Sequence, residues 1–222
     1  MNIDKALEQL KPYRDKHFKL GKAVMLTDGG AMYPLDLLVL ATIKRSLCLL
    51  KGFVSMIEAK NFVAAAPLIR LQLDNCLRLY AGTLVNDPQE FVRKIINGIP
   101  VRNQKDRSNQ LMNDRYLVKK LTQQFTWVKK VYDNTSGYIH LSEKHVFNVL
   151  RASGEDHKFT LRISDSDEFI PDELYIEAID AFKATTDILF KYIYGWAYTK
   201  DNPEEAAKEL RVRSQSKRMD KK

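Results

Sequence analysis

One long apolar helical pattern most constrains the fold of this chain of 222 residues. Residues 35–59 are strongly apolar, with Lys44, Arg45, Lys51 and Glu58 as interruptions. The longest apolar run within it, residues 35–50, is interrupted by Lys44 and Arg45 and is too short to span a bilayer, so we expect no contact with a membrane. A pattern of this length predicts the central helix of a helical protein.

Helical patterns continue on both sides of this segment. Pro12 is expected to kink the first of them or to start its second half, and Pro67 to break the third. Asn61 and Asp114 are the expected N-caps of two long helices. The predicted helices cover residues 2–20, 35–59, 61–84, 88–97, 114–141 and 171–198.

Two segments depart from the helical period. Residues 98–113 are polar and basic and are predicted to form an exposed loop. Residues 145–151 and 157–163 are strand-like and flank a turn-forming Ala-Ser-Gly-Glu-Asp sequence, which predicts a hairpin. We therefore predict an all-α fold, an antiparallel bundle of five or six helices with one small β-hairpin near residues 145–163.

Composition restricts the class of protein. A hydrophobic fraction of 45% and a charged fraction of 29% indicate a soluble globular protein, with one domain in residues 1–200 and a charged tail in 201–222. The charged N-terminus lacks the apolar segment of a secretory signal, so we expect a cytoplasmic location. Cys48 and Cys76 lie in apolar helical patterns and are expected to be buried, free thiols. Neither the cysteines nor the four histidines have metal-binding spacing, so no metal and no cofactor are expected.

Positive charge is concentrated in residues 93–130, which we call the basic segment. It contains ten Lys or Arg against Asp106 and Asp114, a balance of +8 that equals the net charge of the chain. Tyr116, Phe125 and Trp127 lie among these charges. Cations contact phosphates and aromatic rings stack on unpaired bases, so the segment indicates a nucleic-acid interface, although a merely solvated face has the same composition. The candidate binding residues are Arg102, Lys105, Arg107, Arg115, Lys119 and Lys120.

A second constellation follows from four-residue spacing. Tyr132, Ser136 and His140 would share one edge of a helix, where the imidazole could act as a general acid or base. Arg70 and Asp74 form another polar row on an earlier helix. We predict that antiparallel packing brings the two rows into one cleft, with Asp74 orienting the imidazole and Arg70 binding a phosphate. The alternatives are a polar lock between helices and a simple ion pair of Arg70 with Asp74.

The pattern Tyr132-x-x-x-Ser136-x-x-x-His140-x-Ser142, preceded by Arg70 and Asp74, resembles uncharacterised bacterial helical families near the HEPN superfamily. HEPN proteins are all-helical and commonly dimeric, and many are ribonucleases of toxin–antitoxin or phage-defence systems. The resemblance therefore implies a homodimer and a metal-independent ribonuclease whose catalytic residues are Arg70, Asp74, Tyr132, Ser136 and His140.

The chain departs from the HEPN ribonuclease motif at one position. That motif has Arg, four to six further residues and His on one helix, whereas the corresponding positions before His140 hold Asp133, Asn134 and Thr135. Arg70 would have to replace the motif arginine in space. Arg151 and His157 do have the motif spacing, but a predicted turn separates them. A non-catalytic helical adaptor that binds RNA or a partner protein through the basic segment is the alternative function.

Overall fold

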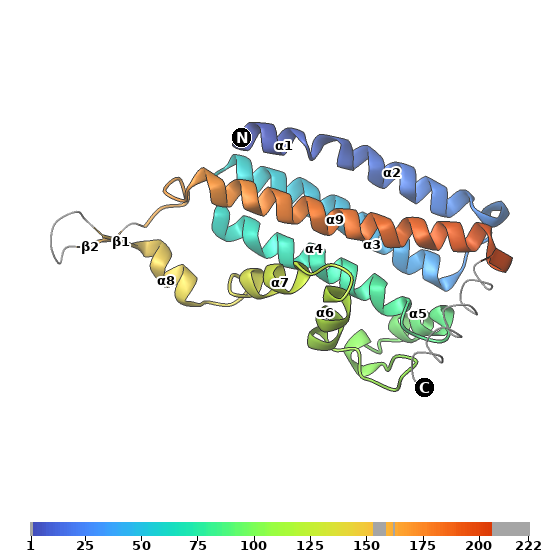
Figure 1. Cartoon of the computed structure of the whole chain (residues 1–222). Coiled ribbons are helices and arrows are strands. Elements are labelled where there is room, and N and C mark those ends of the chain that lie inside the picture. The colour runs from blue at the N-terminus through green and yellow to red at the C-terminus, as the bar shows by residue number, and fades with distance from the viewer. Residues whose placement is uncertain (1, 153–158, 162, 206–222) are drawn as a thin grey trace.

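The computed structural model describes residues 2–152, 159–161 and 163–205. These residues form a mainly α-helical protein, which confirms the predicted class (Figure 1). In chain order the elements are α1 (Ile3–Glu8), α2 (Lys11–Leu26), η1 (Asp28–Gly30), α3 (Pro34–Glu58), α4 (Phe62–Gly82), α5 (Pro88–Ile96), η2 (Val101–Asn103), α6 (Asp114–Thr122), α7 (Val128–Ser136), α8 (Glu143–Val149), β1 (Leu150–Ala152), β2 (Phe159–Leu161) and α9 (Asp172–Asp201).

The long helices α2, α3, α4 and α9 lie side by side in an elongated bundle, and α5, α6 and α7 lie on the α4 side of it (Figure 1). Buried apolar residues form two clusters along the bundle. The first joins α3, α4 and α9 to α5, α6 and α7. In the second, Phe53 of α3 stacks on Phe182 of α9 with ring centroids 4.4 Å apart. The second cluster stabilises the end of the bundle where α1 packs. The first cluster attaches the basic segment to the α4 side of the bundle.

Several helix starts follow from the residues that precede them. Asn61 accepts a hydrogen bond from the backbone N–H of Ala64, and Asp87 accepts from Gln89 and Glu90, as N-caps do. Pro12 lies in the first turn of α2, so this proline separates α1 from α2 as predicted. The prediction for Pro67 is wrong, because α4 continues across it.

A buried polar chain links α2 to the centre of the bundle. The His17 Nδ1 atom lies 2.6 Å from the carbonyl of Tyr13, and Nε2 lies 2.6 Å from the Ser46 hydroxyl. Gln72 donates from its amide to Ser46 and to Thr186 at 2.7 and 2.9 Å. The carbonyl of Tyr13 can only accept, so Nδ1 carries the proton of a neutral imidazole and Nε2 accepts from Ser46. Burial lowers the pKa of His17 below its ordinary value, although the hydrogen bond to Tyr13 acts in the opposite direction.

The predicted helix of residues 114–141 is wrong in its extent. The structure divides it into α6 and α7, and α7 ends at Ser136 with Gly137 as its C-cap. The N-cap of α6 is Asn113, which accepts from the N–H of Tyr116, and not Asp114 as predicted. Leu121 of α6 and Val128 of α7 are both fully buried in the first cluster. Burial of both ends therefore determines the turn between the two helices, since no Gly or Pro lies in 114–136.

The strand predicted at residues 145–151 is also wrong over most of its length. Residues 143–149 form α8, in which the N–H of Ser142 donates to His145 Nδ1 at 3.2 Å. The strands β1 and β2 pair antiparallel over three residues each, with Arg151 opposite Thr160. Residues 153–158, which include His157, lie outside the described part of the chain.

Residues 98–113 are more ordered than the predicted exposed loop. Val101, Gln104 and Met112 are buried, and an isolated bridge pairs Lys105 with Leu111. The buried Gln104 amide donates to the carbonyl of Ile99 at 3.2 Å. Apolar contacts and hydrogen bonds thus fix this part of the basic segment against the bundle.

The two cysteines differ in exposure. Cys76 is buried as predicted. Cys48 is exposed, because it lies on the outer face of α3, whose inner face carries the buried Ser46 and Leu50. Within the described ranges, no helix has the length and hydropathy needed to cross a membrane. Most of the predicted tail, residues 206–222, is outside those ranges.

Candidate nucleic-acid interface

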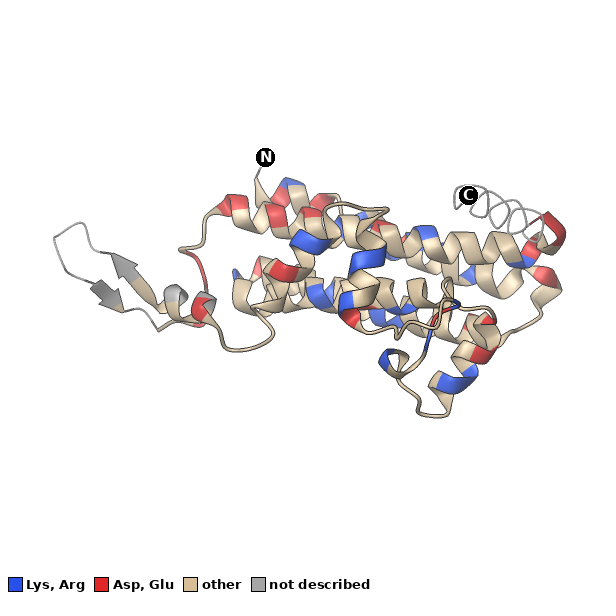
Figure 2. Cartoon of the chain, turned by 60° about the horizontal axis from the view of Figure 1, so that its bottom comes forward, with Lys and Arg blue, Asp and Glu red and all other residues tan. Residues whose placement is uncertain are grey.

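The cations of the basic segment face the solvent. Nine of its ten Lys and Arg residues are exposed, and Lys120 is half-buried with its ammonium 5.5 Å from the centre of the Tyr116 ring. In Figure 2, Lys and Arg recur along the elements from α5 to α7. Three of them have a carboxylate nearby, since Arg93, Lys129 and Lys130 contact Glu90, Asp133 and Glu177. Arg102, Lys105, Arg115 and Lys119 make no ion pair with any described residue.

The two acids of the segment are held by protein donors. Asp106 is 9% exposed and accepts from the Tyr116 hydroxyl at 2.5 Å and from the N–H groups of Ser108 and Gln110. Burial raises the pKa of Asp106, but these hydrogen bonds outweigh it and the pKa lies below its ordinary value. Burial likewise raises the pKa of Asp114, and Arg78 and Arg70 lower it further than burial raises it. Both carboxylates are therefore ionised but bound, and the surface of the segment is dominated by its cations.

Backbone carbonyls bind the cationic group of Arg107, one of the predicted binding residues. Its guanidinium donates to the carbonyls of Thr83, Leu84 and Val85, directly after the end of α4. These carbonyls follow Gly82, the last residue of α4, so Arg107 holds the segment that leaves this helix. Its main contribution is structural.

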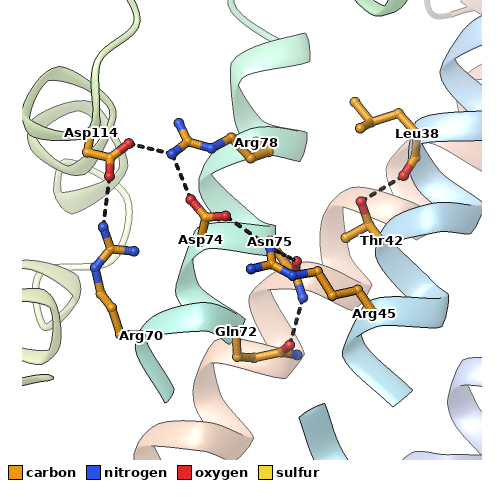
Figure 3. A network of polar contacts seen from close by, with 9 residues as sticks. All are labelled: Leu38, Thr42, Arg45, Arg70, Gln72, Asp74, Asn75, Arg78 and Asp114. Carbon is orange, nitrogen blue, oxygen red and sulfur yellow. Dashed lines mark hydrogen bonds and ion pairs between the residues drawn. The ribbon is translucent and has the colours of Figure 1, made fainter. Parts of the chain in front are cut away.

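Arg70 and Asp74 lie in an ionic network on α4 (Figure 3). The Arg70 guanidinium lies 2.8 Å from Asp114, while Asp74 accepts from Arg45 at 3.0 Å and from Arg78 at 2.7 Å. Arg78 also binds the other oxygen of Asp114, at 2.6 Å. The predicted pair of Arg70 with Asp74 is replaced by an alternating chain of three arginines and two aspartates.

The second predicted row is only partly assembled. Tyr132 meets Arg70, whose guanidinium carbon lies 4.2 Å from the ring centre. Ser136 donates to the carbonyl of Tyr132 within α7, at 2.6 Å. His140 is exposed and follows the end of α7, so it does not continue the helical row. The structure therefore brings Arg70 and Tyr132 together, and both oxygens of Asp74 are bound by arginines.

The site predicted from the sequence did not include Arg45 and Arg78. Arg78 has the same four-residue spacing from Asp74 that Arg70 has, so its participation could have been foreseen. Arg45 comes from α3 and reaches both Asp74 and Asn75, and no local spacing indicates this contact. The Nη1 atom of Arg78 is buried without a hydrogen-bond partner among the described residues, so the network is not fully satisfied.

No family model, curated protein or solved structure matches the chain. In the part of the chain that the structure describes, no group of three or more His, Cys, Asp or Glu side chains is placed to hold a metal ion.

Proposed function

We propose that the protein is an RNA-binding protein and that it binds RNA through the basic segment. The observation that carries the proposal is the arrangement of charge in residues 93–130. Cations without an ion pair face the solvent, whereas Asp106 and Asp114 are bound by protein donors. Such a surface favours a polyanion, because phosphate contacts release condensed counterions and gain affinity at low salt.

Aromatic rings in the same segment favour a nucleic acid over an acidic protein. Tyr116, Phe125 and Trp127 are half-buried, so each keeps some accessible surface. Lys191 lies 5.2 Å from the centre of the Phe125 ring, which places another cation beside an aromatic group. Exposed ring surface next to cations supports stacking on unpaired bases, which is the usual basis of binding to single strands.

Cleavage of RNA is the second candidate. The contact between Arg70 and Tyr132 supports it, because it joins the two helices that were predicted to form the catalytic cleft. Against it, Asp74 is engaged by Arg45 and Arg78 and is not available to orient an imidazole. The HEPN-like ribonuclease centre and the homodimer stay predictions. Loss of cleavage in a folded His140→Ala variant would support such a centre, and light scattering would test the homodimer.

Fluorescence anisotropy with a short labelled single-stranded RNA tests the proposed function. We expect binding that weakens steeply as the salt concentration increases. If four cations contact phosphates, the slope of the logarithm of the association constant against the logarithm of the salt concentration should be about −3. A protein that shows no binding even at low salt, while it is folded by circular dichroism, would contradict the proposal. Displacement of the RNA by an acidic protein, added at the same concentration of negative charge, would favour a protein partner instead.

A further inference from the structure

A hollow lies where the first part of the basic segment packs against the residues that precede it. It has a volume of about 510 Å³ and lies between the end of α4, the α5 helix and residues 99–107. Small-molecule sites in proteins have volumes of about 300–1,000 Å³. We propose that this hollow binds one unpaired nucleotide of the RNA, an inference that rests on the proposed function.

Apolar side chains supply one part of the lining. Phe91 is 2% exposed and belongs to the first core cluster, so its position is fixed. Val85 is half-buried and Ile99 is 41% exposed. Bases present apolar faces that pack on such side chains when they leave the stack. The hollow can therefore cover a base without any rearrangement of the core.

Side-chain amides supply the polar part. Asn86 and Asn103 line the hollow and are exposed, and neither side chain makes a hydrogen bond to another described residue. An asparagine amide offers both donors and an acceptor, which are the groups that pair with the edge of a base. Gln104 differs, because its amide is already bound to the carbonyl of Ile99. Its contribution is to hold the wall in place.

Charged groups at the hollow complete the match. Lys94 and Lys105 are exposed and make no ion pair within the described residues, so they are available to a phosphate. Asp87 caps α5, and Asp106 is held by Tyr116 and two backbone N–H groups. The third carboxylate of the lining, Glu90, lies 3.7 Å from Arg93. All three carboxylates are thus already bound, whereas the ammonium groups of Lys94 and Lys105 have no ion pair with a described residue.

Filling the hollow tests the inference, and Ile99→Trp is the variant for this purpose. Ile96→Trp is the matched control, since Ile96 is 61% exposed on α5 and does not line the hollow. Asn103→Ala is a second variant that removes hydrogen-bonding groups without adding volume, so the test does not depend on the folding of Ile99→Trp. Anisotropy would compare single-stranded RNA, duplex RNA and a mixture of free nucleoside monophosphates.

We expect Ile99→Trp and Asn103→Ala to weaken binding of the single strand by about tenfold and about threefold, and to leave duplex binding unchanged. Ile96→Trp should bind like the parent. If the parent binds the single strand and both pocket variants bind it equally well, the inference is wrong while the proposed function stands. If free monophosphates bind as tightly as the RNA, the site serves a free nucleotide and the inference is also overturned. If the parent binds no RNA, the proposed function fails and the inference fails with it.

Discussion

The ammonium group of Lys200 lies 3.1 Å from the carboxylate of Asp36, and both side chains are at most 1% exposed. Asp36 also accepts from the Trp196 indole N–H at 2.7 Å and from the backbone N–H of Tyr33 at 2.7 Å. Lys200 in turn donates to the carbonyl of Val24 at 3.0 Å. This buried pair therefore fastens the last turn of α9 to the start of α3 and the end of α2.

Removal of one partner of this pair should be strongly destabilising. We expect Lys200→Met to lower the free energy of unfolding by about 3 kcal/mol or more, because the carboxylate of Asp36 stays buried without its counter-ion. Lys22→Met, at an exposed position of α2, is the control and should change stability little. Urea unfolding followed by circular dichroism measures both. Equal stability of the two variants would contradict the role assigned to Lys200.

The buried imidazole predicts a loss of stability in mild acid. Because the pKa of His17 is lower in the folded protein than its ordinary value of 6.5, the unfolded chain binds the proton more readily. The contribution of His17 is therefore fully present above about pH 6.5 and is lost as the pH falls below that value, by at most about 1.4 kcal/mol per pH unit. Urea unfolding at pH 7.5 and 5.5 should show this decrease in the parent. In His17→Gln, which retains a partner for Ser46, the decrease should be smaller. The same decrease in the variant as in the parent would contradict the role of His17.

Most helices could be predicted from local sequence, and the reasons are visible at their ends. Asn61 and Asp87 cap helices that begin where the sequence indicated. The helix α7 ends at Ser136, four residues before His140, and its C-cap Gly137 has a right-handed conformation that any residue can adopt, so the sequence carries no clear stop signal there. The turn between α6 and α7 has no such signal, because the burial of Leu121 and Val128 determines it.

The candidate site was less predictable than the fold. Residue spacing placed Arg70 beside Asp74, but Arg70 binds Asp114 of α6. Asp74 binds Arg45 of α3 in addition to Arg78 of its own helix. The buried partner of Asp36 is 164 positions away in the chain, so only the packed bundle brings it into contact. Exposure of the basic segment, in contrast, followed from composition alone, since unpaired Lys and Arg side chains are rarely buried.

Two predicted binding residues should separate structure from binding. We expect Arg107→Ala to lower the free energy of unfolding by about 1 kcal/mol, because three carbonyls after α4 lose a donor. Arg102→Ala should leave stability unchanged, since the side chain is exposed, but should weaken RNA binding. Thermal unfolding and anisotropy measure the two effects. Should the two variants show the same stability, Arg107 would not have the structural role described above.

Anisotropy with two variants of equal charge tests the central claim most directly. One variant changes Arg102, Lys105, Arg115 and Lys119 to alanine, and the other changes four exposed lysines of α2 and α3 to alanine, namely Lys19, Lys22, Lys44 and Lys51. Both lose four positive charges, so they differ only in where the charge is removed. We predict that the first variant loses about a hundredfold in affinity for single-stranded RNA at low salt and that the second loses less than about threefold. Equal affinities of the two variants would contradict an RNA interface in the basic segment.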